Sequence, residues 1–319
     1  MSYTVIRLRI VPTMNHLRTA LLAVLALSFS VVAGGGTAGA APRVATFTDA
    51  AVQSFARGVV SPVGANDFRC TSSSPPVVLV HGTWENAFDT WSALTPALRD
   101  AKRCVFSLNF GKGRDLIGRT AGVFGTGPIE TSAGELKKFI DVVQSKTGAG
   151  RVDLVAHSQG GIVARYYLKF LGGSKAANRL VTLGTTQTGL LSPRLAQVAA
   201  RLRAAGLPVG DIVEQVTGQA IAERLTQSTL LNRLNAGGPL LPGITYTTVN
   251  SRTDELNTDL SQTQLPVAAS VTNFVVQDGC EINGVGHFNL PYDPRSVALT
   301  LRGLGISVPL TCARELSPL

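Results

Sequence analysis

The feature that most constrains this chain is a buried strand joined to a helix through a short hinge that carries a serine. Arg151–Val155 has the apolar character of a strand, Ala156–Gly160 is the hinge, and Gly161–Phe170 has a helical pattern. Small residues at both ends of the hinge leave room for a sharp turn that lifts the hydroxyl of Ser158 above the sheet. A serine that caps an ordinary helix is the alternative. The strand–turn–helix context favours a nucleophile elbow, G-x-S-x-G, with alanine in place of the first glycine.

The histidine inventory then narrows the choice of a general base for Ser158. The chain has four histidines, of which His16 lies in a predicted leader and His157 is adjacent to the serine, where we expect its side chain to point away. His81 ends a strand beside Gly82, a position that has a different role in the α/β-hydrolase fold. His287 remains, late in the chain, and the order serine, acid, histidine is the one that α/β-hydrolases use. An ordinary surface histidine is the alternative reading.

The first 40 residues have the features of a signal peptide. Three arginines precede an apolar run from Ala20 to Ala33, and small residues follow at Ala38–Ala40. The run is shorter than the roughly 20 apolar residues of a membrane span, and no second run of that length follows. We expect translation to start at Met1 or Met14, cleavage after Ala40, and a secreted protein without a transmembrane anchor.

The charge of the chain is positive but dispersed. Removing residues 1–40 takes away three arginines and no acids, so the formal charge falls from +9 to +6. The densest basic groups are Lys137–Lys138 and Arg201–Arg203, and neither has the interleaved aromatic residues of a single-strand binder or a DNA-binding motif. We therefore expect no nucleic-acid partner and assign the excess charge to solubility and to approach to anionic surfaces.

Four cysteines remain in the exported chain, and four cysteines allow three pairings. An oxidising compartment favours the use of all of them in disulfides. Their positions favour two local bridges, Cys70–Cys104 and Cys280–Cys312. Zinc is the alternative, but the sequence has neither a C-x-x-C spacing nor a histidine pair that supports it. We expect no metal.

The remaining chain, about 279 of the 319 residues, suits one domain with strands and helices in alternation. Near-continuous apolar runs predict strands that are covered on both faces, as in a parallel sheet. Helical patterns between them indicate a doubly wound α/β sheet. The predicted strands are Val77–His81, Cys104–Phe110, Val152–Val155, Leu180–Leu183, Ile244–Asn250 and Val271–Val276.

Two helices have clear start signals. One is predicted to begin with Ser132 as its cap, with Glu135 reaching back, and to bury a stripe at helical spacing that comprises Leu136, Phe139, Ile140 and Val143. Another follows Asp293-Pro294, with proline at the first helical position.

Three regions depart from the regular alternation. Residues 41–69 form an N-terminal extension with little signal, ahead of a main domain over 70–319. Gly111–Gly127 holds six glycines and reads as a loop beside the site. Residues 190–242 are long and mostly amphipathic, with one stripe at Leu195–Leu202 and another at Ile212–Leu225. We interpret this insertion as a helical cap over Ser158, and a pair of core helices is the alternative.

An α/β-hydrolase takes its two oxyanion donors from the loop after an early strand and from the residue after the nucleophile. The strand Val77–His81 leads into Gly82-Thr83-Trp84, so the candidates are the backbone N–H groups of Thr83 and Gln159. Backbone donors of this kind stabilise the anionic intermediate without lysine, arginine or metal.

The third catalytic group must be a carboxylate on the loop after the next-to-last strand, Ile244–Asn250. The candidates are Asp254, Glu255, Asp259 and Asp278. Asp278 lies only nine residues before His287, at the end of the last strand. We expect Asp254, the first acid after the turn, to orient the imidazole and to stabilise the imidazolium.

Several segments together resemble one family, the exported bacterial class 2 lipases. They are Val77–Asn86, the elbow Val155–Gly161, Arg165–Gly173, Ser251–Glu255 and Gly286-His287. The resemblance spans roughly residues 70–312 and implies an α/β-hydrolase fold, esterase or triacylglycerol lipase activity, no organic cofactor, and both local disulfides. Two departures are Ala156 and Thr185–Gly189, where a segment with a histidine is often found.

The resulting expectation is a monomeric, secreted serine carboxylic-ester hydrolase with Ser158, His287 and Asp254 as its triad. The resemblance implies acylglycerol substrates, met at a lipid–water interface, and an acyl-enzyme intermediate. One alternative is an extracellular acyltransferase that uses the same triad. Another is a catalytically silent hydrolase fold that binds a lipid.

Overall fold

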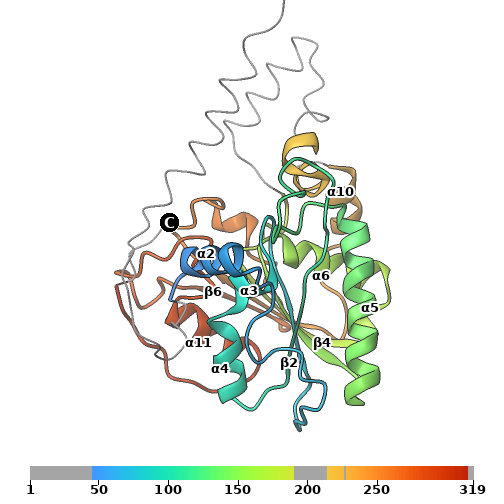
Figure 1. Ribbon diagram of the computed structural model, residues 1–319. Helices are drawn as coiled ribbons and strands as arrows, with labels where there is room; N and C mark the ends of the chain where they lie inside the picture. The colour runs from blue at the N-terminus through green and yellow to red at the C-terminus, as the bar shows by residue number, and fades with distance from the viewer. Residues whose placement is uncertain (1–44, 190–213, 226–227, 315–319) are drawn as a thin grey trace, which may run out of the picture. The chain divides into compact units, whose positions relative to one another are not determined.

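The computed structural model describes residues 45–189, 214–225 and 228–314, whose centre is a six-stranded sheet with every pairing parallel. The strand order is β2-β1-β3-β4-β5-β6 (Figure 1). Along the chain, the sheet therefore begins with β1, adds β2 on one side of it, and then adds β3 to β6 in turn on the other side. This is the predicted doubly wound arrangement. The strands are β1 (Val77–Val80), β2 (Val105–Leu108), β3 (Val152–His157), β4 (Ala177–Leu183), β5 (Thr245–Asn250) and β6 (Val271–Val275).

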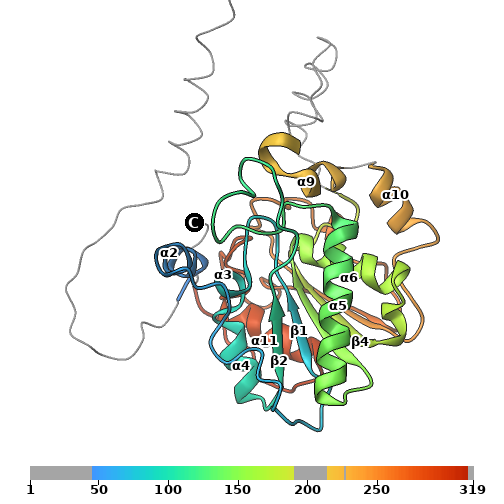
Figure 2. The same cartoon turned by 45° about the vertical axis from the view of Figure 1, so that its right-hand side comes forward.

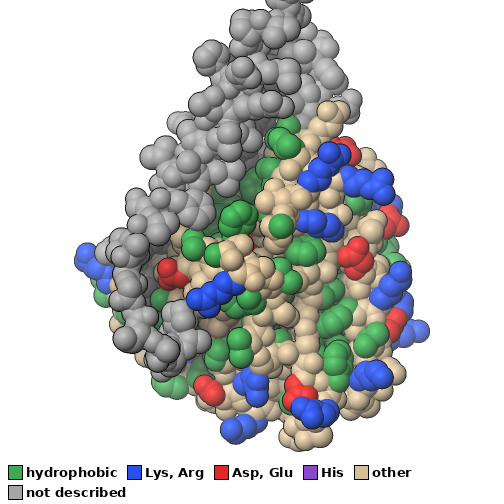
Figure 3. All heavy atoms as spheres, in the orientation of Figure 1, with side chains coloured by type: hydrophobic (Ala, Val, Ile, Leu, Met, Phe, Trp, Pro, Cys, Tyr) green, Lys and Arg blue, Asp and Glu red, His purple; other side chains and the backbone are tan. Residues whose placement is uncertain are grey.

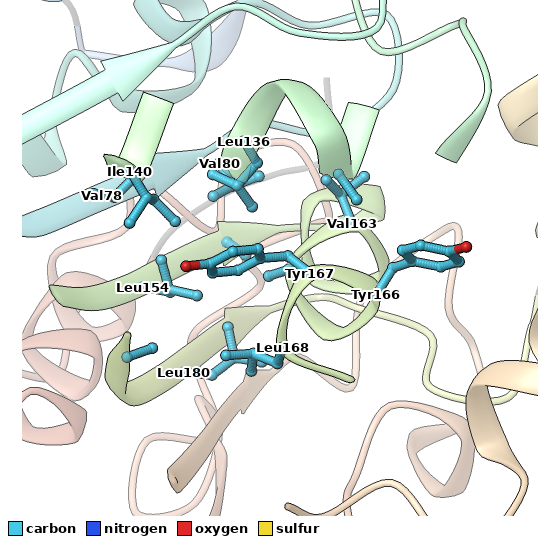
Figure 4. Close-up of a cluster of buried hydrophobic side chains, with 14 of the residues drawn as sticks. Val78, Val80, Leu136, Ile140, Leu154, Val163, Tyr166, Tyr167, Leu168 and Leu180 are labelled. Atoms are coloured by element: carbon cyan, nitrogen blue, oxygen red, sulfur yellow. The ribbon is translucent and has the colours of Figure 1, made fainter. Parts of the chain in front are cut away.

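One face of the sheet is covered by α5 (Ile129–Thr147) and α6 (Gln159–Phe170), which lie together in both ribbon views (Figures 1 and 2). Because side chains alternate along a strand, Val78 and Val80 of β1 point to this side. Figure 4 shows them with Leu154 and Leu180 of the neighbouring strands, packed against side chains of the two helices that include Leu136, Ile140, Val163, Tyr167 and Leu168.

The opposite face is covered by α3 (Ala87–Trp91), α4 (Leu94–Asp100) and α11 (Pro294–Gly303). Here the alternate residues of β1, Val77 and Leu79, pack with side chains from these helices. The predicted start of the last helix is confirmed: Asp293 accepts a hydrogen bond from Ser296 N–H at 2.7 Å, and proline follows it at the first helical position.

The predicted start of α5 is wrong by one turn. The helix begins at Ile129 after Pro128, and Ser132 is buried inside it, with its hydroxyl donating to Pro128 O at 2.8 Å. Glu135 does not reach back, because its carboxylate accepts the N–H of Gly111 at 2.9 Å. A tertiary contact with the glycine-rich loop thus replaces the expected local cap.

The extension before β1 contains a helix that the sequence did not indicate, α2 (Phe47–Arg57). Thr46 caps it by accepting the N–H of Asp49 at 3.1 Å. Ala50 is fully buried in a small cluster with Phe88 and Tyr292, so this part of the extension packs on the domain beside α3.

The predicted cap lies partly outside the described residues, as do its stripes at Leu195–Leu202 and at Ile212 and Val213. The described parts form α9 (Gln219–Glu223) and α10 (Thr229–Asn235), which lie at one end of the molecule in both views (Figures 1 and 2). Leu231 and Leu234 of α10 and Ala220 of α9 all belong to the core cluster that includes side chains of α6. The N–H of Ala220 also donates to Thr126 O in the glycine-rich loop at 3.2 Å.

Two short 3-10 helices, η1 (Gly173–Lys175) and η2 (Leu260–Gln262), complete the described elements. Disulfides join Cys70 to Cys104 and Cys280 to Cys312, which are the two local pairings that the sequence favours. Among the residues described, no helix is long and apolar enough to cross a membrane. On the face shown in Figure 3, basic side chains are scattered among acidic and apolar ones.

Candidate active site

The turn between β3 and α6 consists of one residue, so the predicted five-residue hinge is too long. β3 continues to His157, α6 begins at Gln159, and Ser158 alone makes the turn with φ 50° and ψ −122°. A positive φ is rare for a residue other than glycine and stores strain. The conformation is held by the N–H of Ser158, which donates to Leu183 O at 2.9 Å, and by the hydroxyl of Thr185, which donates to Ser158 O at 2.8 Å.

A glycine two residues after the serine is required by packing. A Cβ atom on Gly160 would lie 2.2 Å from the carbonyl oxygen of Val80 and 2.6 Å from that of His81. The first turn of α6 therefore approaches the end of β1 as closely as backbones allow. This contact explains the second glycine of the elbow pattern and brings the loop after β1 beside Ser158.

Asp254 and His287 form a buried pair at the same end of the sheet. Asp254 lies on the loop after β5, His287 follows β6, and Nδ1 of His287 is 2.8 Å from Oδ2 of Asp254. Because Nδ1 then carries the proton, Nε2 is the basic nitrogen. Within the described parts of the chain, this Nε2 has no hydrogen-bond partner, and it is buried. The pair can thus hold an imidazole ready to accept a proton.

The carboxylate of Asp254 is held in its ionised form. Burial raises its pKa, but the charge and hydrogen bond of His287 and the hydrogen bonds of Asn257 outweigh burial and lower the pKa below its ordinary value. Backbone N–H groups of Leu256 and Asn257 donate to Oδ1 at 2.9 and 2.7 Å, and the Asn257 amide donates to Oδ2 at 3.1 Å. Four hydrogen-bond donors, from Leu256, Asn257 and His287, therefore hold this carboxylate.

Two contacts connect this pair with the serine turn. Leu183 accepts the N–H of Ser158, and the next residue, Gly184, lies against both members of the pair. In addition, the ring of His157, which precedes the serine, lies 4.9 Å from the ring of His287. The structure thus brings Ser158, His287 and Asp254 to one end of the sheet, as the sequence predicts.

The other acids that competed for the third position lie elsewhere. Asp278 is exposed and pairs with Arg252, and Asp259 is exposed and bonds to Ser261. Glu255 does approach the base, but its carboxylate accepts the backbone N–H of His287 at 2.8 Å and not a ring nitrogen.

Thr83 and Gln159 lie together, as expected of two oxyanion donors. The hydroxyl of Thr83 donates to Oε1 of Gln159, and Nε2 of Gln159 donates to Gly125 O at 2.9 Å. Neither backbone N–H donates to another residue of the described chain. The next N–H, that of Trp84, is already used by Phe124 O at 2.9 Å. The predicted pair of amides is therefore free to bind an anionic oxygen.

The glycine-rich loop lies beside the site, as predicted. Gly125 has φ 70°, and a Cβ there would lie 2.4 Å from the carbonyl oxygen of Gly82. The carbonyl of Gly125 also accepts the amide of Gln159. This glycine therefore allows the loop to contact both halves of the candidate oxyanion hole.

A second histidine–carboxylate pair, which the sequence did not indicate, lies behind the first. Nδ1 of His157 is 3.0 Å from the carboxylate of Glu85, and its Nε2 is 3.1 Å from the carbonyl oxygen of His287. Burial raises the pKa of Glu85, but His157 and donors from Thr90 and Gly82 outweigh it and lower the pKa. Burial lowers the pKa of His157, yet Glu85 raises it overall. The result is an ion pair that links the elbow, the oxyanion loop and the loop of the base.

Asn257, Glu85 and Gly184 are the site residues that sequence reasoning missed. Each acts through the position of another side chain, and only the fold reveals such contacts. Among the described residues, no group of three histidine, cysteine or acidic side chains is arranged to hold a metal ion.

Two solved structures that are similar to this chain are both structures of lipases. Lipase B of Aspergillus fumigatus is similar over 87% of this chain, with a TM-score of 0.59 and 16% identity, and the chain spans 61% of the length of that protein. The mature lipase BlEst2 of Bacillus licheniformis matches 66% of this chain and 87% of its own, with a TM-score of 0.45 and 16% identity. The strand order and the first of these similarities identify the α/β-hydrolase fold.

The sequence itself matches the family model described as lipase (class 2) over residues 74–280. This match includes β1, the elbow and the loop of Asp254, and it ends seven residues before His287. Since it covers more than half of the 319 residues, the chain belongs to the class 2 lipase family of α/β-hydrolases.

Proposed function

We propose that this protein is a secreted serine carboxylic-ester hydrolase that cleaves acylglycerols through a Ser158–His287–Asp254 triad. The observation that carries the proposal is the strained Ser158 turn beside a buried Asp254–His287 pair whose Nε2 is unoccupied by any described residue. A serine hydroxyl is a weak nucleophile until a neighbouring base removes its proton. The strain and the burial are features that a purely structural serine does not need.

The proposed reaction has two halves. Nε2 of His287 takes the hydroxyl proton as Oγ of Ser158 attacks the ester carbonyl, and the N–H groups of Thr83 and Gln159 bind the oxygen that becomes negative. The tetrahedral intermediate collapses when the C–O bond to the alcohol breaks, and the imidazolium gives its proton to that alcohol. Water, deprotonated by His287, then attacks the acyl carbon. The bond from that carbon to Oγ of Ser158 breaks, the imidazolium returns the proton to Oγ, and the acid is released. Asp254 stabilises the imidazolium in both halves without taking its proton.

The substrate class rests on the family. Lipases act on acylglycerols, and the protein most similar in fold among those described above is named a lipase. We propose that residues 190–242 cover the site as a cap and provide an apolar surface for the acyl chain. Each CH₂ group that the cap buries would contribute about 0.8 kcal/mol to binding.

The proposal of secretion is supported by the two disulfides, which suit an oxidising compartment. The predicted signal peptide lies outside the described residues. We propose a monomer that needs no cofactor.

A chain-length series of p-nitrophenyl esters, with emulsified triglyceride measured alongside, tests the substrate assignment. We expect kcat/KM to rise with acyl length until the apolar surface is filled, and the emulsion to be hydrolysed. Acetate as the best substrate, with no release of fatty acid from triglyceride, would contradict a lipase and leave a short-chain esterase. Acyl esters of an added alcohol, formed faster than free acid, would instead indicate the acyltransferase.

A further inference from the structure

A buried arginine in the candidate cap contacts the candidate oxyanion hole. Arg224 follows α9, its side chain is 4% exposed, and its guanidinium donates to the hydroxyl oxygen of Thr83 at 2.7 Å. That hydroxyl donates in turn to Oε1 of Gln159. One continuous chain of hydrogen bonds therefore runs from Arg224 through both residues of the candidate oxyanion hole.

The charge of this arginine is poorly compensated by the described residues. It forms no ion pair with any of them, and its Nε is buried without a hydrogen-bond partner. The charge of Glu85 raises the pKa of Arg224, but that carboxylate is already paired with His157. Burial lowers the pKa of Arg224 to about 10, so the guanidinium still carries its proton at neutral pH.

A buried cation with a neutral partner opposes folding. The presence of one beside the candidate reaction centre therefore needs a functional reason. The developing oxyanion supplies one, because positive charge that is fixed in advance near that oxygen stabilises the transition state more than the ground state. A hydrogen bond donated by a charged group is also stronger than a neutral one and polarises the bonds that follow it.

We propose that Arg224 is a positioning residue of the oxyanion hole, which fixes Thr83 relative to Gln159 and adds positive potential where the negative charge forms. This inference rests on the proposed ester hydrolysis. It also gives the cap segment a role in the chemical step, since the hole reaches its working geometry only with Arg224 in contact with Thr83.

Arg224→Met, which removes the charge and the donors but keeps an unbranched side chain of four heavy atoms, is the direct test. With p-nitrophenyl butyrate we expect kcat to fall roughly 10- to 100-fold, less than the roughly 10²–10³-fold loss of a direct oxyanion donor, with KM changed less than threefold. A phenylboronic acid forms an anionic tetrahedral adduct with the active serine. Its affinity should fall by a factor similar to that for kcat, while the melting temperature stays level or rises.

Arg165→Met is the matched control. Arg165 is also buried, and burial also lowers its pKa to about 10, but its guanidinium donates to Gln187 O at 3.1 Å and to Asn235. Loss of this arginine should change stability and leave the ratio of boronate affinity to KM unchanged.

A cycle with Thr83→Val, which removes the hydroxyl and keeps the backbone N–H, shows whether Arg224 acts through Thr83. We expect Arg224→Met to have little further effect in that background. If Arg224→Met does not fold, Arg224→Lys, which keeps the charge but not the planar fork, should still lower kcat and boronate affinity together. Wild-type kcat and boronate affinity in the folded Arg224 variant would overturn the inference. Absence of ester hydrolysis in the wild type would instead overturn the proposed function.

Discussion

Gly184 and His287 are in such close contact that a side chain on Gly184 would force its neighbours to shift. A Cβ on Gly184 would lie 3.1 Å from Nδ1 of the histidine and 3.1 Å from Oδ2 of Asp254. Gly184 also has φ 56°, and its N–H donates to Val249 O at 3.0 Å. The glycine thus lets the end of β4 press against the acid–base pair and limits where the imidazole can lie.

Gly184→Ala should therefore impair activity more than stability alone explains. Alanine at a left-handed φ costs about 1–2 kcal/mol, and the added methyl would also push His287 from its place. Gly172→Ala is a matched control, because Gly172 has φ 81° and no atom within 4 Å of its Cβ position. Gly184→Ala should lose at least as much unfolding free energy in urea as Gly172→Ala, but only Gly184→Ala should lose kcat by tenfold or more. Equal activities would show that the contact does not position the base.

The identity of the acid is tested by amide substitutions. Asp254→Asn should lower kcat roughly 10³–10⁴-fold, because the imidazole loses the carboxylate that fixes its tautomer. Glu255→Gln and Asp278→Asn should lower it far less, since the first carboxylate holds only a backbone N–H and the second is exposed. Steady-state kinetics on one soluble ester ranks the three variants. A larger loss for Glu255→Gln or Asp278→Asn would move the assignment away from Asp254.

His81 should make the fold sensitive to acid. Its Nε2 accepts the N–H of Phe110 at 3.3 Å, and burial lowers its pKa from 6.5 to about 4. Between pH 6.5 and pH 4, His81 is protonated in the unfolded chain but not in the folded chain. The unfolding free energy should therefore fall as the pH drops from 6.5 to 4. At 1.36 kcal/mol per pKa unit, the loss is about 3 kcal/mol.

The measurement is the unfolding free energy against pH for the wild type and His81→Gln, which cannot titrate. The variant should lose less stability over this range, whatever its stability at pH 7. Parallel curves would show that His81 is not responsible.

Two buried carboxyl groups near the oxyanion loop should differ in how much stability the fold loses when each is neutralised. Glu85 is ionised and paired with His157, so Glu85→Gln should destabilise the fold by about 3–5 kcal/mol, because it leaves a buried histidine without its charge partner. Burial raises the pKa of Asp89 well above its ordinary value, so the loss of its charge in Asp89→Asn should cost much less. Urea unfolding of both variants at pH 7 compares them. The reverse order would contradict the role of Glu85 as the charge partner of His157.

Much of this architecture is predictable from the sequence, because it depends on local patterns. All six strands lie within a few residues of their predicted positions, since buried parallel strands need continuous apolar runs. The elbow, His287 and Asp254 could be predicted because the order of triad residues and their placement after strands are fixed by the fold.

Other features depend on contacts between distant segments. The start of α5 was missed because Glu135 bonds to Gly111 across the fold, and a capping pattern cannot reveal that competition. Arg224 looked like one basic residue among many, and only its contact with Thr83 sets it apart. The helix α2, over residues 47–57, was also missed, and its buried residues are the small side chains Ala50 and Ser54.

Covalent labelling of Ser158 by a fluorophosphonate, with Ser158→Ala as the control, tests the central claim most directly. The reagent reacts with a serine only where a base activates the hydroxyl and an oxyanion hole accepts the phosphonyl oxygen. The account predicts one label per chain, mapped to Ser158 by peptide mass spectrometry, together with loss of ester hydrolysis. Ser158→Ala should take up no label, hydrolyse no ester and keep the melting temperature of the wild type. Labelling at another serine, or ester hydrolysis by Ser158→Ala at the wild-type rate, would contradict the account.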